Sequence, residues 1–212
     1  MGVHKSTVRK CLFRVTKVIN NIMVKNCMFM PSEDEAEFIS LQFKRKSFIP
    51  QLIGSIDGTH IPITAPQEGY QDFVNRKGWT SYNVMAVVDH NGRFRNVVIK
   101  HPGSVHDAAV FKDSRRPAVN QSCETQTSEN INGMAVPYMI VGEPAYPMLP
   151  WLIKGYSGSL SAEESFNVYL NSARVSVEMA FEWLEEVSNS DKLFPQPIAV
   201  QNRDRDCIPA IT

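Results

Sequence analysis

The chain has 212 residues, of which 43% are hydrophobic, and its 22 basic side chains balance 22 acidic ones. This length suits one large domain with or without a small appendage, and the zero net charge gives no global reason to expect a polyanionic partner. No run approaches the roughly 20 apolar residues of a membrane-spanning helix, and the four cysteines have neither zinc-knuckle nor disulfide-framework spacing. We therefore expect a soluble, unsecreted protein with reduced thiols.

The N-terminal segment concentrates positive charge, because residues 1–25 include six basic side chains and no acidic one. Apolar residues recur three or four positions apart, which predicts an amphipathic helix: Val8, Leu12, Val15 and Ile19. A Ser or Thr cap before a basic helix is typical of the second helix of a helix-turn-helix, and an ordinary surface helix is the alternative. The candidate DNA contacts are Lys5, Ser6, Thr7, Arg9 and Lys10. Because no preceding helix is present, we expect only a partial helix-turn-helix over residues 1–30.

A connector helix is predicted over residues 31–50. Ser32 and Glu35 have the spacing of a capping box at its start, and Pro50 ends it. The following run, residues 52–57, reads as a buried strand, and Gly58 is predicted to turn the backbone away after Asp57. This would place the Asp57 carboxylate at a strand end, where sheets usually hold ligands. A plain Asp-Gly turn joining two strands explains the same residues equally well.

The middle of the chain reads as a hairpin followed by a helix. Residues 84–88 and 94–99 are β-rich, and Asn91-Gly92 between them favours a tight turn. Asp107 then begins a short helix through Phe111, with Ser104 or Asp107 as its cap. Residues 115–135 are polar and aperiodic, so we expect an exposed loop there.

A second acid follows a strand in the same way as Asp57. The apolar run 137–142 ends at Glu143, and if its strand lies parallel and next to that of Asp57, the acids are about 5 Å apart. Residues from Ser161 to Leu184 then show the spacing of a long helix, with Arg174 and Glu178 on a flanking face. A surface ion pair between these two, worth about 0.3–0.5 kcal/mol, is the simpler interpretation of Glu178.

The order of these elements resembles the ribonuclease-H-like fold of DDE transposases, and several linked motifs are similar to the PIF/Harbinger transposases and their domesticated nuclease relatives. The similarity covers roughly residues 1–186. The N-terminal stretch from Gly2 to Val8 also resembles the degenerate helix-turn-helix of that family. The other motifs are Ile56 to Ile61, Tyr70 with Asn75 to Gly78, Ser81 to Val84, Pro102 to Asp107, Gly142 to Pro147 with Leu149 to Leu152, Phe166-Asn167 with Ala173-Arg174, and Val177 to Phe181.

The resemblance implies an α/β domain with a mixed sheet flanked by helices and a metal-dependent DNA endonuclease activity. In the family, two Asp and one Glu hold two divalent cations, Mg²⁺ or Mn²⁺, for in-line displacement at phosphorus. Mapped onto this chain, Asp57, Glu143 and Glu178 would be the catalytic and metal-binding acids, with Asp107 as a further metal ligand or a helix cap. Family members also act on DNA in the nucleus with a Myb/SANT-like partner protein, and the cytoplasm is a second expected compartment.

The chain departs from the family pattern at three places. Glu143 stands where the family has Asp, and the longer side chain changes the placement of its oxygens. Acids at residues 182, 185 and 186 replace a Gly and a basic stretch. The tail 191–212 lacks the family's final helix, so the resemblance implies a copy shortened at both ends, with residues 51–190 as its nuclease domain. A catalytically inactive remnant that binds DNA or a protein is the second expected function.

Overall fold

The computed structural model describes residues 4–113, 129–158 and 160–189. At its centre is a five-stranded sheet in the order β3-β2-β1-β6-β7. Strands β1, β2 and β3 are antiparallel neighbours, whereas β6 runs parallel to β1 and β7 parallel to β6. The bounds are Leu52–Pro62 for β1, Ser81–Val88 for β2, Phe94–Pro102 for β3, Met139–Gly142 for β6 and Leu152–Lys154 for β7. This mixed sheet with flanking helices fits the expected ribonuclease-H-like fold.

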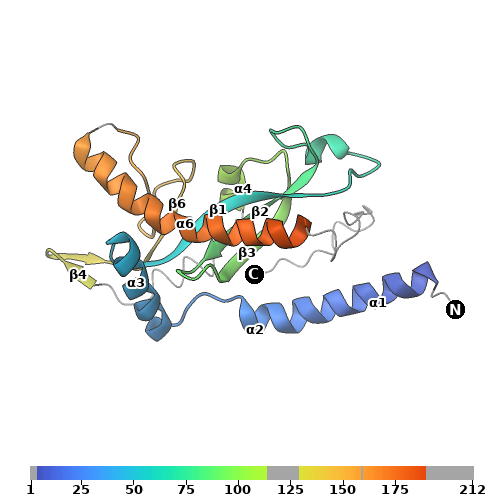
Figure 1. Ribbon diagram of the computed structural model, residues 1–212, viewed down its shortest axis with the longest axis horizontal. Coiled ribbons are helices and arrows are strands. Elements are labelled where there is room, and N and C mark those ends of the chain that lie inside the picture. The colour runs from blue at the N-terminus through green and yellow to red at the C-terminus, as the bar shows by residue number, and fades with distance from the viewer. Residues whose placement is uncertain (1–3, 114–128, 159, 190–212) are drawn as a thin grey trace.

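Two helices cover opposite faces of the sheet. The long helix α6, Ser161–Asn189, lies across β1, where the Ser55 hydroxyl donates to a carbonyl of α6 over 2.9 Å. The short helix α4, Asp107–Asp113, lies against Gly58. Residues 55 and 58 point to opposite sides of a strand, so α6 and α4 lie on opposite faces (Figure 1).

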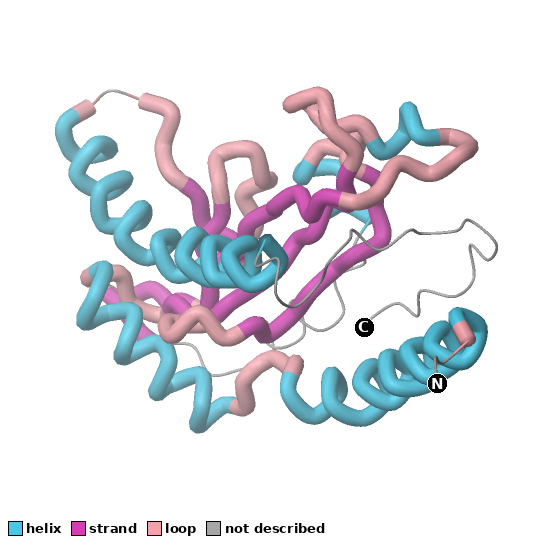
Figure 2. Tube along the Cα trace, turned by 45° about the vertical axis from the view of Figure 1, so that its right-hand side comes forward, coloured by secondary structure: helices cyan, strands magenta, loops and turns pink. Residues whose placement is uncertain are grey.

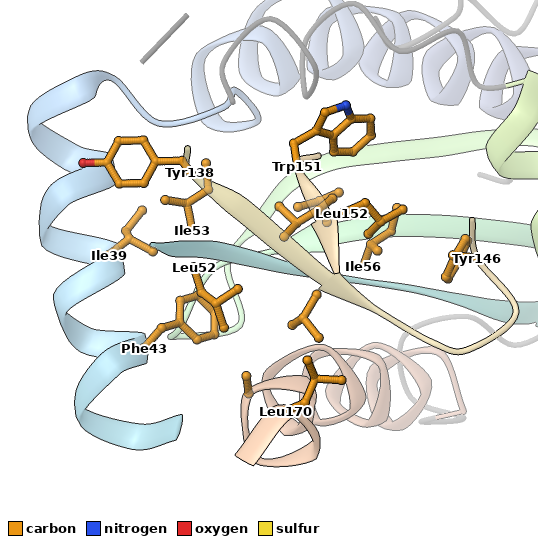
Figure 3. Packing of buried hydrophobic residues seen from close by; sticks show 14 of the residues in the cluster. Ile39, Phe43, Leu52, Ile53, Ile56, Tyr138, Tyr146, Trp151, Leu152 and Leu170 are labelled. Atoms are coloured by element: carbon orange, nitrogen blue, oxygen red, sulfur yellow. The ribbon is translucent and has the colours of Figure 1, made fainter. Parts of the chain in front are cut away.

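The core lies between the sheet and its helices. Figure 3 shows Ile39 and Phe43 of α3, Glu33–Ser47, against Leu52 and Ile53 of β1. All four of these side chains are at most 1% exposed. Farther along the sheet the same cluster includes Ile56, Tyr146, Trp151, Leu152 and Leu170. This packing fixes β1, β6 and α6 relative to one another, and the candidate acids lie on or directly after these elements.

The N-terminal segment is one helical run, formed by α1 (Lys5–Val18), a π-helical stretch (Ile19–Val24) and α2 (Lys25–Cys27). It extends beside the sheet domain, and no residue of α1 is buried (Figure 2). The predicted partial helix-turn-helix is therefore not confirmed. The predicted Ser or Thr cap is also wrong, because His4 Nδ1 accepts the Ser6 N–H bond at the start of α1.

The predicted turn after Asp57 is wrong, and so is the alternative of an Asp-Gly turn. Strand β1 continues through both residues to Pro62, with Asp57 opposite Ala86 of β2. The physical reason is that β2 offers hydrogen-bonding partners along this whole length. Gly58 serves a close approach instead, since a Cβ there would lie 2.5 Å from an oxygen of Asp107.

Most other predicted elements are confirmed. The hairpin β2–β3 turns at Gly92, whose φ is +74°, and Asp89 accepts bonds from two N–H groups of that turn. The predicted loop 115–135 is wrong in its last part, because Glu129–Ile131 (β4) pairs with Met134–Val136 (β5). Residues 114–128 and the tail 191–212 lie outside the described residues. Within the described ranges, no helix has the length and apolar content needed to span a bilayer.

Candidate active site

The sheet brings Asp57 and Glu143 together at the point where β6 ends. Strand β1 pairs with β6 only as far as Ser55 opposite Val141, so Asp57 lies just beyond the last paired residue. Gly142 ends β6, and a Cβ at this residue would come within 2.9 Å of Ile56 and 3.0 Å of Tyr146. Only glycine therefore fits where the chain leaves the sheet and delivers Glu143 beside Asp57.

Helix α6 supplies the third acid. Ala173 and Val177 are fully buried against the sheet, which places Arg174 and Glu178 on the flank of the helix. The contact is fixed by Ser55, whose hydroxyl donates to the Ala173 carbonyl and lies 2.9 Å from the Ser176 hydroxyl. This anchor holds the side of α6 that bears Arg174 and Glu178 next to the part of β1 that contains Asp57.

The three predicted acids converge on one guanidinium nitrogen. Arg174 Nη2 lies 3.5 Å from Asp57 Oδ2, 2.9 Å from Glu143 Oε1 and 3.6 Å from Glu178 Oε1. Since all three distances end on the same atom, the carboxylate oxygens are at most about 7 Å apart. We call Asp57, Glu143, Glu178 and Arg174 the acid cluster. The Arg174–Glu178 ion pair expected for a surface helix is present as well, and it belongs to this larger arrangement.

The fourth predicted acid, Asp107, lies at the edge of the acid cluster. Asn83 of β2 holds it by donating from Nδ2 to Asp107 Oδ1 over 2.7 Å, and the same nitrogen donates to the Val105 carbonyl. Asp107 is the first residue of α4 and packs against Gly58, one residue after Asp57. It is therefore positioned to add negative charge beside Asp57 without a direct contact to Arg174.

The electrostatics of Asp57 show an excess of negative charge. The pKa of this carboxyl is raised to about 7, first by burial and then by the charges of Glu143 and Asp107. The Gly58 N–H, 2.7 Å from Oδ1, and the Arg174 guanidinium act in the opposite direction. The single arginine does not compensate for this burial and repulsion, so an additional positive charge would stabilise the ionised form of Asp57.

Tyr146 adds an unsatisfied polar group to the same region. Its side chain is 1% exposed, and its hydroxyl has no hydrogen-bond partner among the described residues. Burial and the charges of Asp107, Asp57 and Glu143 raise the pKa of this hydroxyl. A buried hydroxyl beside three carboxylates fits a place where a water or ligand oxygen completes the hydrogen bonding.

The donor set fits a hard divalent cation in its chemistry, because it consists of carboxylate oxygens from three elements. Its present geometry does not, since no group of three His, Cys, Asp or Glu within the described ranges is arranged to hold a metal. Arg174 occupies the centre on which the three acids converge. A cation could bind there only after the guanidinium moves aside.

The predicted DNA contacts lie elsewhere in the molecule. Lys5, Ser6, Thr7, Arg9 and Lys10 are all exposed on α1. Helix α1 runs apart from the sheet in both views of the chain (Figures 1 and 2). The structure thus does not bring these residues to the acid cluster.

Several positioning residues were not predicted. Ser55, Ser176 and Asn83 are buried polar residues that hold the acid-bearing elements together, and Tyr146 is a buried hydroxyl next to the acids. Two of them, Ser55 and Ser176, are small polar residues inside otherwise apolar runs, and this pattern could have identified them. Arg174 was predicted only as the ion-pair partner of Glu178.

Comparisons with known proteins identify the family of the chain. Residues 56–186 match the family model of the DDE superfamily endonuclease. Protein ALP1-like of Arabidopsis thaliana is 27% identical over 197 residues, which cover 87% of this chain and 47% of that protein. A Rattus norvegicus protein whose name describes it as a nuclease, HARBI1, is 26% identical, with 72% of this chain and 41% of that protein covered. The chain spans about half the length of these relatives. No solved structure matches it.

Proposed function

The chain belongs to the DDE superfamily endonucleases, and from that premise we propose that its acid cluster cleaves phosphodiester bonds of DNA with the help of divalent cations. The observation that carries the proposal is the convergence of Asp57, Glu143 and Glu178 on one atom from three separate elements. The nuclease name of the HARBI1 relatives supports the same reaction class.

DDE superfamily endonucleases generally use divalent metals, and Asp57, Glu143 and Glu178 are the residues that would hold them here. Bound cations would supply charge stabilisation for the attacking and leaving oxygens of a displacement at phosphorus. The protein's own part is positional. The buried Ser55–Ser176 contact fixes Asp57 relative to Glu178, and Asn83 fixes Asp107 beside them.

A catalytically inactive remnant that binds DNA or a protein is the second candidate function. It is favoured by Glu143, because this residue has one more methylene than the family's Asp and already gives its Oε1 to Arg174 at 2.9 Å. A Glu that reaches Arg174 in this way can leave the two-metal geometry incomplete. Such sites need their ligand oxygens within about 0.5 Å of the positions that the reaction requires.

A plasmid-nicking assay with Mg²⁺ or Mn²⁺ separates the two candidates. We expect the native chain to nick slowly and Glu143→Asp to nick about tenfold faster or more, because the shorter side chain restores the family geometry. Asp57→Ala is the negative control and should not nick. Nicking by Glu143→Asp alone would establish the native chain as the inactive remnant, and equal rates for both would show that residue 143 does not limit the reaction.

We propose further that α1 contacts the DNA backbone through its basic side chains. The double variant Arg9→Gln/Lys10→Gln should weaken DNA binding for all sequences alike and lower the slope of log K against log salt by about 2, one unit for each lost phosphate contact. Fluorescence anisotropy over a salt series measures both effects. The matched control is Lys44→Gln/Arg45→Gln in the last turn of α3, where two neighbouring basic residues are also exposed. An unchanged slope for the α1 variant would contradict the proposal.

A nuclear location and a Myb/SANT-like partner protein follow from the same proposal. DNA as substrate requires access to chromosomes, and an additional DNA-binding protein would raise the local concentration of this chain on its target. Co-purification of a Myb/SANT-like protein with nuclear extracts of the tagged chain is the corresponding observation.

A further inference from the structure

A basic turn, residues 75–79, lies at the end of β1 that points away from α3 (Figure 1). It comes just before Ser81 of β2, which pairs with Pro62 at the end of β1. Arg76 and Lys77 at its tip are exposed, and the turn contains no acid. Within the described ranges, neither of these two side chains belongs to an ion pair. The basic turn therefore presents positive charge that the protein does not neutralise.

Buried polar side chains fix the basic turn to β1. Asn75, which is 5% exposed, accepts the Lys77 N–H at Oδ1 over 2.9 Å and donates from Nδ2 to Ser81 Oγ over 3.1 Å. The fully buried Ser81 Oγ lies 3.1 Å from His60 Nδ1. His60 follows Asp57 by three positions in β1, which corresponds to about 10 Å along the strand. The turn is therefore held in a fixed place relative to the acid cluster.

His60 lies between the basic turn and the acids. Burial lowers the pKa of its imidazole, the charge of Asp107 raises it, and the two charges of the basic turn lower it. Asp107 also contributes to the raised pKa of Asp57. The basic turn and the acids are thus near enough to act on one imidazole. A polyanion that reaches the acid cluster along β1 passes the basic turn first.

Lys154 supplies positive charge on the other side of the acids. It ends β7 and pairs in register with Gly142, the residue before Glu143. Its Nζ donates to the Pro144 carbonyl over 3.0 Å, and among the described residues it has no acidic partner. Neighbouring strands are about 4.8 Å apart, so Lys154 lies roughly one strand spacing from the start of the Glu143 segment. The acid cluster therefore lies between two basic positions along one edge of the sheet.

Both basic positions border the α4 face of the sheet. Ile56 and His60 are two positions before and after Gly58, so they share the face of β1 that packs against α4. A Cβ on the last residue of β6 would meet the side chains of both Ile56 and Leu152, so Leu152 lies on this face as well. Lys154 follows Leu152 by two positions in β7 and points the same way.

The opposite face is acidic at the same edge. Thr59 points to the α6 face and donates from Oγ1 to Glu185 Oε1 over 3.1 Å. Glu182 and Glu186 are exposed on the same part of α6, and residues 175–189 of this helix include no basic side chain. DNA phosphates are therefore repelled on the α6 side of the edge and attracted on the α4 side.

We infer that a DNA strand crosses the acid cluster on the α4 side of the strand ends, with Arg76 and Lys77 binding its phosphates on one side and Lys154 on the other. This DNA path rests on the proposed function for the identity of its ligand. Phosphates of one strand repeat about every 3.4 Å along the helix axis, so the distance from Asp57 to His60 spans about three nucleotides. Such contacts position the strand and read no sequence.

DNA binding in EDTA over a salt series tests this path without any cleavage. Arg76→Gln/Lys77→Gln should lower the slope of log K against log salt by about 2 and Lys154→Gln by about 1, one unit for each lost phosphate contact. Fluorescence anisotropy with a labelled DNA duplex measures the slopes. The matched control is Lys44→Gln/Arg45→Gln/Lys46→Gln, which removes three exposed charges from α3 at the other end of β1 and should leave the slope unchanged. An unchanged slope for either test variant, or an equal loss in the control, would overturn the path.

Glu182→Gln/Glu186→Gln distinguishes the two faces of the edge. If the strand passes on the α4 side, the affinity for DNA should rise about twofold or less at physiological salt, because screening over a Debye length of about 8 Å weakens repulsion from α6. A larger gain would place the DNA along α6 and overturn the path.

Plasmid nicking separates this DNA path from the nuclease activity. If the basic variants lose slope while the native chain does not nick, the path holds and the nuclease activity fails. If the native chain nicks and the basic variants keep its slope, the path is wrong and the nuclease activity stands. A native chain that binds no duplex in EDTA would overturn the path as well.

Discussion

Arg174→Gln is expected to destabilise the metal-free protein and to strengthen its binding of Mn²⁺. Within the described ranges, the Arg174 guanidinium is the one cation that contacts Asp57, Glu143 and Glu178 together. Without it, the buried Asp57 carboxyl faces Glu143 and Asp107 with no opposing charge from α6. The same removal frees the centre of the acid cluster, so a divalent cation no longer has to displace an arginine before it binds.

The expected loss of unfolding free energy is about 2–3 kcal/mol in EDTA. Breaking a buried ion pair costs about 3–5 kcal/mol, but Glu143 and Glu178 are partly exposed and Asp57 can take up a proton, which both reduce the cost. The affinity for Mn²⁺ should rise about tenfold, which corresponds to about 1.4 kcal/mol. Urea unfolding and isothermal titration calorimetry measure the two quantities without any cleavage assay.

Arg93→Gln is the matched control, because Arg93 is an exposed arginine on the β2–β3 hairpin and, within the described ranges, forms no ion pair with the acid cluster. It should change neither stability nor Mn²⁺ affinity by a comparable amount. If Arg174→Gln binds Mn²⁺ no better than the native chain, the guanidinium does not compete with the cation. If the Arg174→Gln variant also has the same urea midpoint of unfolding as the native chain, the three contacts of Arg174 contribute nothing to stability.

The order of elements and the candidate acids could be predicted because they depend on local patterns. Glu143 follows an apolar run that ends in Gly142, and Glu178 lies one helical turn from Arg174 on a strongly periodic helix. The approach of Asp57 and Glu143 was expected only on the condition that their strands are parallel neighbours, and β1 and β6 meet this condition. These parts of the site are determined within a few residues of the acids themselves.

The wrong predictions arise where local patterns do not decide the structure. In each of them, a residue far away in the sequence overrides a local preference. Asp57-Gly58 has the composition of a turn, yet β2 pairs with it and extends the strand. Ser32 is the N-cap residue of α3 but makes no side-chain cap bond, and Glu35 of the expected capping box pairs with Arg95 over 2.6 Å. Residue 95 is 60 positions away, so no local spacing could have revealed it.

The central position of Arg174 could not be predicted for the same reason. Its spacing to Glu178 predicts an ordinary ion pair within a helix, and that pair exists at 3.6 Å. The contacts with Asp57 and Glu143 depend on how α6 is anchored to β1 through Ser55. Sequence order indicates which acids are candidates, whereas only packing shows that an arginine lies between them.

Asp57→Asn is expected to stabilise the metal-free protein at alkaline pH while removing its Mn²⁺ site. The pKa of Asp57 is raised from 3.8 to about 7, so between these values the folded state binds a proton that the unfolded state has lost. Stability therefore falls as the pH rises through this window. The asparagine keeps an Oδ1 acceptor for the Gly58 N–H and has no charge to desolvate.

The difference between variant and native chain should be largest above about pH 7 and vanish near pH 4. At about 1.36 kcal/mol per unit of pKa, the full shift corresponds to about 4 kcal/mol at most. Urea unfolding in EDTA across this pH range measures it, and Asp72→Asn, an exposed aspartate, is the control that should show no such trend. A variant that is less stable than the native chain at pH 8 would mean that Arg174 already compensates the Asp57 charge. A more stable variant that binds no Mn²⁺ would show that this carboxylate is retained at a cost to folding, as expected of a group whose role is to hold a cation.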